Sequence, residues 1–183
     1  MFEKLTASAI FRCESVEGTL GTVTGSGSFL AELMRRVVEI MADRGVFASV
    51  DVHNNTGLNP HYACVNRLDH RFFHLATLFS RTVVYFLRPL GVQSMALAEL
   101  CPAVTLECGK VGQVRGVDHA RDYIDACLHL AEHSEHPVAI QDIDLFHTVA
   151  QVTLPNEAAF SFSHDKVDIQ FNPDLDHMNF LEV

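Results

Sequence analysis

Two stretches of the chain place chemically active side chains directly after runs that are typical of buried strands. In "VFASVDVHNNTG", the mostly apolar run ends on Asp51, His53, Asn54 and Asn55, and in "AVTLECG" it ends on Glu107. Parallel α/β folds place their sites at the carboxyl ends of strands. A carboxylate at the end of a buried strand is costly unless it lies in a solvated cleft or is paired. We therefore expect the imidazole and the Glu107 carboxylate to meet in one hollow.

The residue types in these two stretches suit metal-assisted hydrolysis. His53 could bind a metal, and Asp51, on the same side of the strand by the period of two, could brace its imidazole. Glu107 could take a proton from a zinc-held water and pass it to a leaving nitrogen. Asn54 and Asn55 supply side-chain amides that could bind a substrate. The alternative is that these polar residues only form a turn at the end of a strand.

Two further histidine clusters have spacings that can hold a metal. His70 and His74 are four residues apart, and "HLAEH", from His129 to His133, matches the pattern H-x-x-E-H. In a helix, both clusters lie away from the apolar stripe and face solvent. We therefore expect neither cluster to form a metal site, which also argues against a protein that stores or senses metal through these histidines.

Three more residues close to these two stretches in the sequence could belong to the same site. His61 and Tyr62 follow the Asn-Gly loop and could line the same cleft. His61 could bind a metal there, and packing within the loop is the alternative. Cys108 alternates with Glu107 to the opposite side of the strand. We interpret Cys108 as a core residue and not as a nucleophile.

Composition excludes several classes of protein. The 183 residues carry 23 acidic and 13 basic side chains, a formal net charge of −10, which disfavours nucleic acid as a partner. No apolar stretch reaches the roughly 20 residues that a membrane helix needs. Five irregularly spaced cysteines and a start that does not resemble a secretory signal favour a cytoplasmic location.

Hydrophobic periodicity predicts strands that alternate with helices. The expected helices cover residues 29–43, 69–80, 93–100 and 119–133, and the expected strands cover 46–52, 82–87 and 103–107. This order predicts an α/β fold with a mixed, largely parallel sheet flanked by helices. An incomplete sheet of this kind has an open edge that could pair in a homo-oligomer.

The residue pattern of the sequence changes after Pro137. Short β-rich segments separated by Pro155-Asn156 and His164-Asp165 follow there. We expect an α/β domain at residues 1–137 and the start of a small C-terminal β domain at residues 138–183.

The stretches "DVHNNTG" and "PAVTLECGKVGQ" resemble two motifs of the succinylglutamate desuccinylase/aspartoacylase family, within the zinc carboxypeptidase clan. The tail "FNPDLDHMNFLEV" resembles the opening of that family's C-terminal β domain. The resemblance implies that His53 is a ligand of one Zn²⁺ ion and that Glu107 is the general acid/base. It also implies a carboxypeptidase-like metallohydrolase that cleaves an amide bond in a small N-acyl amino acid or a peptide-like substrate.

The chain departs from the family pattern in its first half. The family takes two more zinc ligands from an earlier His-x-x-Glu motif, and no histidine precedes His53 here. The Asn-Arg pair that holds a substrate carboxylate is also missing, as are a tyrosine and an arginine expected before Glu107. We therefore expect a chain truncated at both ends. The competing hypothesis is a catalytically incomplete scaffold or binding module that lacks the zinc motif.

Overall fold

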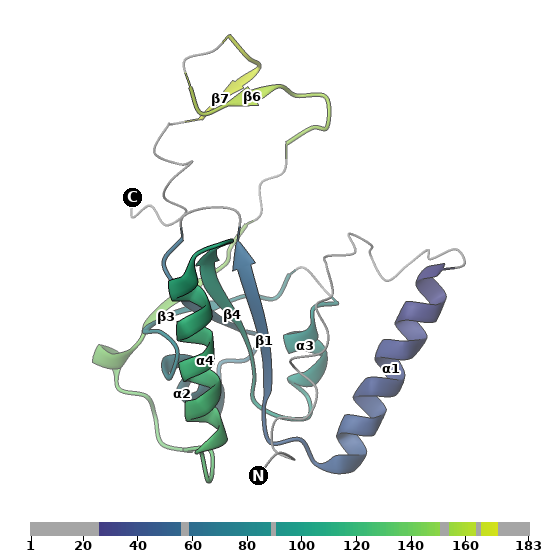
Figure 1. Cartoon of the computed structure of the whole chain (residues 1–183), viewed down its shortest axis with the longest axis vertical. Coiled ribbons are helices and arrows are strands. Elements are labelled where there is room, and N and C mark those ends of the chain that lie inside the picture. The colour runs from purple at the N-terminus through teal and green to yellow at the C-terminus, as the bar shows by residue number, and fades with distance from the viewer. Residues whose placement is uncertain (1–25, 56–58, 89–90, 151–153, 164–165, 172–183) are drawn as a thin grey trace.

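Helices flank both faces of a five-stranded sheet in the computed structural model, which describes residues 26–55, 59–88, 91–150, 154–163 and 166–171 (Figure 1). The helices are α1 (Ser26–Arg44), α2 (His70–Thr77), α3 (Gln93–Leu97) and α4 (Val114–Leu128), with a 3-10 turn at Ile140–Asp142. The strands are β1 (Ser49–Asn55), β2 (Tyr62–Val65), β3 (Thr82–Tyr85), β4 (Ala103–Lys110), β5 (Asp144–His147), β6 (Phe160–Ser161) and β7 (Ile169–Gln170).

The sheet is mixed and largely parallel, with the strand order β1-β4-β2-β3-β5. The pairs β1/β4, β2/β3 and β3/β5 are parallel, and β2 runs antiparallel to β4. The prediction of an α/β fold with a largely parallel sheet is confirmed. Within the described ranges, no helix has the length and apolar character that crossing a bilayer requires.

Several element boundaries differ from those predicted. Strand β1 continues to Asn55 because its pairing with β4 extends through His53 and Asn55. Helix α4 begins at Val114 and ends at Leu128, about five residues before the predicted bounds at each end. Strand β2 was not predicted, because four residues without clear alternation are a weak local signal.

The segment after Pro137 contributes to the main sheet. Strand β5 pairs in parallel with β3, so it extends the sheet of the α/β domain. Strands β6 and β7 form a separate two-stranded sheet. The predicted boundary between two domains, at residues 137 and 138, stays a prediction. It assigned β5 to the second domain, whereas β5 pairs with a strand of the main sheet.

One face of the sheet is apolar and is covered by α2 and α4. Leu106 and Cys108 on β4 are buried on this face, together with the aromatic side chain of Tyr123 on α4. The Tyr123 hydroxyl donates a hydrogen bond of 3.1 Å to the carbonyl oxygen of Leu75, which ties α4 to α2. Figure 1 shows α1 and α3 on the other side of β1 and β4.

Gly116 allows α4 to approach β4 closely. A Cβ atom at this position would lie 2.2 Å from the backbone carbonyl oxygen of Cys108. A backbone atom cannot rotate away as a flexible side chain can, so any larger residue must displace the helix. The close contact therefore depends on the absence of a side chain.

We expect Gly116→Ala to lower the free energy of unfolding by about 2 kcal/mol, the range found for overpacked cores. Alanine in a helix would otherwise stabilise the protein by about 1 kcal/mol relative to glycine. Urea denaturation measures the difference. Val117→Ala, at a neighbouring helical position whose side chain is 68% exposed, is the control and should change stability little. A stabilised Gly116→Ala variant would contradict this packing.

Candidate functional site

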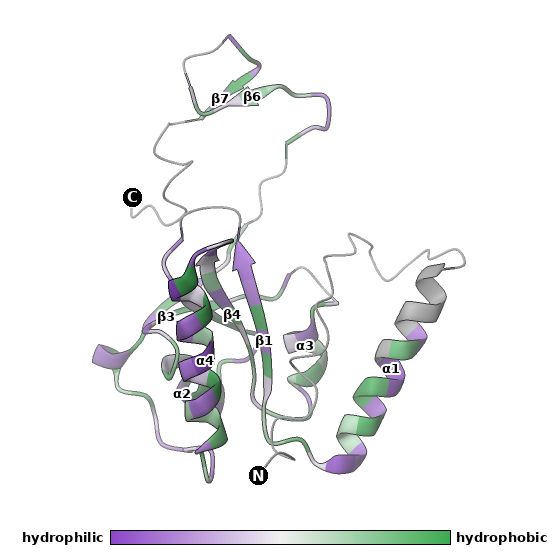
Figure 2. Ribbon diagram, in the orientation of Figure 1, coloured by the Kyte–Doolittle hydropathy of each residue, from purple (hydrophilic) through white to green (hydrophobic). Residues whose placement is uncertain are grey.

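The site is built on two neighbouring parallel strands that end in polar residues. Figure 2 shows β1 changing from hydrophobic to hydrophilic along its length. The register pairs His53 on β1 with Glu107 on β4. Because paired residues of neighbouring strands project to the same face, the two side chains lie together on the face opposite α2 and α4. The expected meeting of imidazole and carboxylate is thus found in the structure.

Asp51 holds the His53 imidazole from one side. Its Oδ2 atom lies 3.1 Å from Nε2 of His53, and Asp51 itself is only 7% exposed. The other ring nitrogen, Nδ1, lies 4.0 Å from Oε1 of Glu107. A carboxylate contact at one ring nitrogen orients the imidazole and favours the tautomer that leaves the second nitrogen as an acceptor. Nδ1 is therefore the atom of His53 that is presented to the Glu107 side.

Glu107 lies in an environment that favours its protonated form. Burial raises the pKa of its carboxyl group, and the nearby Asp51 carboxylate raises it further. His53 and a hydrogen bond from Asn55 act in the opposite direction and lower this pKa. The net pKa is above the usual value of 4.5. A carboxyl group shifted upward in this way exchanges a proton more readily near neutral pH, as a general acid/base must.

The two asparagines of the motif occupy different positions. Asn54 is exposed, and the structure records no contact between it and Glu107. Asn55 donates from Nδ2 to Oε2 of Glu107 at 3.4 Å. The Oδ1 atom of Asn55 is buried and has no hydrogen-bond partner among the described residues. Substrate binding by Asn54 and Asn55 stays a prediction, and the structure adds a contact of Asn55 with the carboxylate.

Tyr62 lies on the same face as Glu107, as the sequence suggested for the cleft. The antiparallel register of β2 and β4 pairs Tyr62 with Glu107. Burial and the Glu107 carboxylate both raise the pKa of the Tyr62 hydroxyl far above its usual value of 10.0. The phenol is therefore neutral at physiological pH and can donate a hydrogen bond beside the carboxylate.

His61 alternates to the opposite face and does not join this site. Its Nδ1 atom lies 2.7 Å from Nδ1 of His119 on α4, and both rings stack on Phe79. Burial lowers the pKa of His61, and its neighbours His119 and Arg115 lower this pKa further. Gly109 at the end of β4 packs against this ring, because a Cβ there would lie 3.0 Å from Nε2 of His61. The structure thus shows His61 packed against His119 and Phe79, outside its own loop, and metal binding by His61 stays a hypothesis.

The other histidine clusters make protein contacts. His74 lies with its Nε2 atom 2.7 Å from the carbonyl oxygen of His136, and His70 is exposed. His133 stacks on Phe47 and contacts the Phe47 carbonyl oxygen. The helical phase predicted for His133 was wrong, because α4 ends before it at Leu128. Cys108 is 2% exposed in the core, as predicted, and burial raises the pKa of its thiol to about 11.

The described residues do not by themselves complete a zinc site. His53 presents Nδ1 beside Glu107, but no group of three His, Cys, Asp or Glu side chains suited to a metal occurs in the described part of the chain. Catalytic zinc sites use three protein ligands and a water molecule. His53 is thus a single candidate ligand with a bracing carboxylate.

The fold is similar to that of two succinylglutamate desuccinylases. No protein-family model and no curated protein matches the sequence. The enzyme from Chromobacterium violaceum has a TM-score of 0.50 and 20% identity, over 75% of this chain and 46% of that chain. The enzyme from Vibrio parahaemolyticus has a TM-score of 0.51 and 16% identity, over 81% of this chain and 48% of that chain. The chain thus matches about half the length of each, and at these identities the likeness is one of fold.

Replacing Glu107 by glutamine should stabilise the metal-free protein at pH 7. Because the folded protein raises the pKa of this carboxyl, folding stability falls as the pH rises above about 4.5 and through the folded-state pKa. Glu107→Gln removes the ionisable group and with it this loss of stability. The melting temperature of the variant should therefore exceed the wild-type value at pH 7 and equal it at pH 4. Each 1 kcal/mol gained corresponds to about 2–4 °C in a protein of this size.

Thermal unfolding followed by circular dichroism at both pH values measures this effect. The exposed Glu132 provides a matched control. Glu132→Gln should show no gain that depends on pH. An equal gain for Glu107→Gln at pH 4 and pH 7 would show that burial of the charge is not the cause.

Proposed function

We propose that this chain carries the His53–Glu107 part of a hydrolase site that cleaves an amide bond in an N-acyl amino acid or a peptide-like substrate. The observation that supports it most is the placement of a carboxylate-braced imidazole beside a partly buried glutamate, at the carboxyl ends of paired parallel strands. The fold shared with two desuccinylases supports the same reaction class. The names of those enzymes describe removal of a succinyl group from succinylglutamate.

In this proposal Glu107 moves the proton. Its carboxylate accepts a proton from the attacking water, and the resulting carboxylic acid passes that proton to the leaving nitrogen. The raised pKa of Glu107 brings its protonation equilibrium closer to the working pH, which suits both halves of this transfer. Asn55 orients the carboxylate through its hydrogen bond to Oε2. Tyr62, neutral and adjacent, is placed to donate a hydrogen bond to the substrate carbonyl.

Zinc is the cofactor that we propose, with His53 as one ligand. When bound, such an ion supplies a polarised carbonyl and a more acidic water molecule. The described residues offer one ligand where three are needed, so we assign no reaction step to the metal. The same shortage of ligands among the described residues favours the second candidate function, a catalytically incomplete scaffold or binding module.

Zinc binding by the 183-residue chain should be weak and should depend on His53. Isothermal titration with zinc chloride is expected to show a heat of binding that His53→Ala abolishes. His129→Ala, which removes an exposed imidazole at the end of α4, is the matched control and should leave the titration unchanged. Tight binding that survives His53→Ala would remove His53 from the proposed metal site.

Hydrolysis should be slow and should depend on Glu107. With zinc present, release of free amine from N-acetyl, N-succinyl and N-phenylacetyl amino acids measures turnover. Glu107→Gln should lower the rate by about 10²–10⁴, the usual contribution of a general acid/base. Turnover that is the same in wild type and Glu107→Gln would refute the proposed role. A complete absence of turnover in the wild-type chain with bound zinc would favour the scaffold or binding module.

A further inference from the structure

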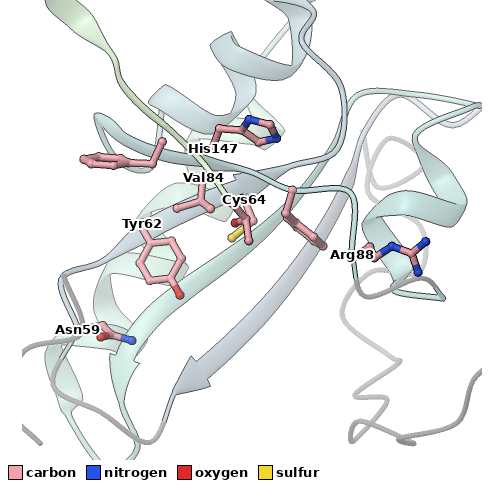
Figure 3. Close-up of a pocket in the computed structure, with 9 residues that line it drawn as sticks. Asn59, Tyr62, Cys64, Val84, Arg88 and His147 are labelled. Atoms are coloured by element: carbon pink, nitrogen blue, oxygen red, sulfur yellow. The ribbon is translucent and has the colours of Figure 1, made fainter. Parts of the chain in front are cut away.

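A cavity of about 520 Å³ opens next to Tyr62, on the face of the sheet that carries Glu107 (Figure 3). Tyr62, which is paired with Glu107, forms one end of it together with Asn59. Two residues further along β2, Cys64 is paired with Val84 on β3, which is paired with Phe146 on β5. This row lies about 7 Å from the Tyr62–Glu107 pair, the length of two residues of a strand. The cavity therefore begins at the proposed reaction centre and extends away from it.

The floor of the cavity is apolar and aromatic. Val84 and the rings of Phe86 and Phe146 line it, and Phe146 keeps 39% of its surface exposed. The volume lies within the roughly 300–1,000 Å³ that is usual for small-molecule sites. A partly exposed aromatic wall around a cavity of this size is suited to bury an apolar group of a ligand.

Two basic side chains, Arg88 and His147, also line the cavity, so its preference for a ligand depends on how they lie relative to the apolar floor. Arg88 lies at the end away from Tyr62, and Figure 3 shows its guanidinium pointing away from the other labelled side chains. The Glu107 carboxylate adds to burial in raising the pKa of the Cys64 thiol to about 12 and of Tyr62 still further. Both groups are thus neutral, and neither offers a positive charge to a ligand carboxylate. A ligand carboxylate placed directly over Val84, Phe86 and Phe146 would lose hydration against an apolar surface.

We infer that this cavity binds the acyl group of the substrate and selects an uncharged, apolar or arylalkyl acyl chain over a dicarboxylic one such as succinyl. This inference rests on the proposed function for the position of the scissile amide, beside Glu107 and Tyr62. The chain of the acyl group then runs along β2 and β3 over Cys64 and Val84. The predicted selectivity differs from that in the names of the two desuccinylases of similar fold.

Binding of two amides that share the same head group tests the inference. 4-Phenylbutanamide carries an apolar tail, and succinamate carries a carboxylate. Titration of the full 183-residue chain with each, followed by NMR of valine methyl groups, should show at least tenfold tighter binding of 4-phenylbutanamide. The methyl signals of Val84 should shift, and those of the exposed Val117 should not. Equal or tighter binding of succinamate, or unshifted Val84 signals, would overturn the inference.

A variant that fills the cavity gives a second test. Val84→Phe should weaken binding of 4-phenylbutanamide at least tenfold, and the same change at Val117 should not. If Val84→Phe does not fold, judged by circular dichroism, the wild-type methyl shifts decide the question alone. Hydrolysis without a response of Val84 would refute the cavity and leave the hydrolase proposal intact. Binding in the cavity without hydrolysis of N-(4-phenylbutanoyl) amino acids would refute the hydrolase proposal and leave the cavity intact.

Discussion

The parallel register between β1 and β4 is the constraint on which the candidate site depends. It aligns Val50 with Val104 and His53 with Glu107. Because side chains alternate along a strand, a shift of one residue in either strand would separate imidazole from carboxylate by the thickness of the sheet. The apolar residues of the opposite face oppose such a shift, since it would expose Leu106 and bury polar groups under the helices. The packing of the core therefore also holds the chemical groups in place.

The site combines two carboxylates and one imidazole in a partly buried space. Asp51 and Glu107 lie on either side of His53, and the Asp51 carboxylate raises the pKa of Glu107. The imidazole and the Asn55 amide partly offset this repulsion. Such an arrangement costs folding stability and produces a carboxyl group with unusual affinity for a proton. Carboxyl groups whose pKa is shifted by burial and by neighbouring charges are more common at functional sites than in structural cores.

The two faces of the sheet differ in composition and in role: one packs against helices, and the other carries the candidate site. The face under α2 and α4 is closely packed, to the extent that a glycine is needed at position 116 where α4 meets β4. The opposite face carries the polar residues of β1 and β4 and then becomes apolar across β2, β3 and β5. A polar reaction centre that continues into an apolar cavity suits a substrate with a polar amide and an apolar tail. The antiparallel strand β2 joins the two regions, because Tyr62 belongs to both.

The sequence alone was sufficient for features that depend on local patterns. The change from apolar to polar residues at Asp51–His53 and at Glu107 marks the polar carboxyl-terminal parts of two strands, and the period of two assigns Cys108 to the core. The alternation of helices and strands predicts the fold class, because each element must bury one face.

Features that depend on distant contacts were decided by the tertiary structure. Strand β2 is too short to be recognised locally and exists through its pairing with β3 and β4. The first turn of α4 packs on β4 where Gly116 meets the backbone of Cys108, a contact between residues on different elements. Whether His61 binds a metal or packs was open in the sequence, and only the folded chain shows it packed beside His119, 58 residues away. Partners this far apart leave no trace in a local pattern, because only the folded chain brings them together.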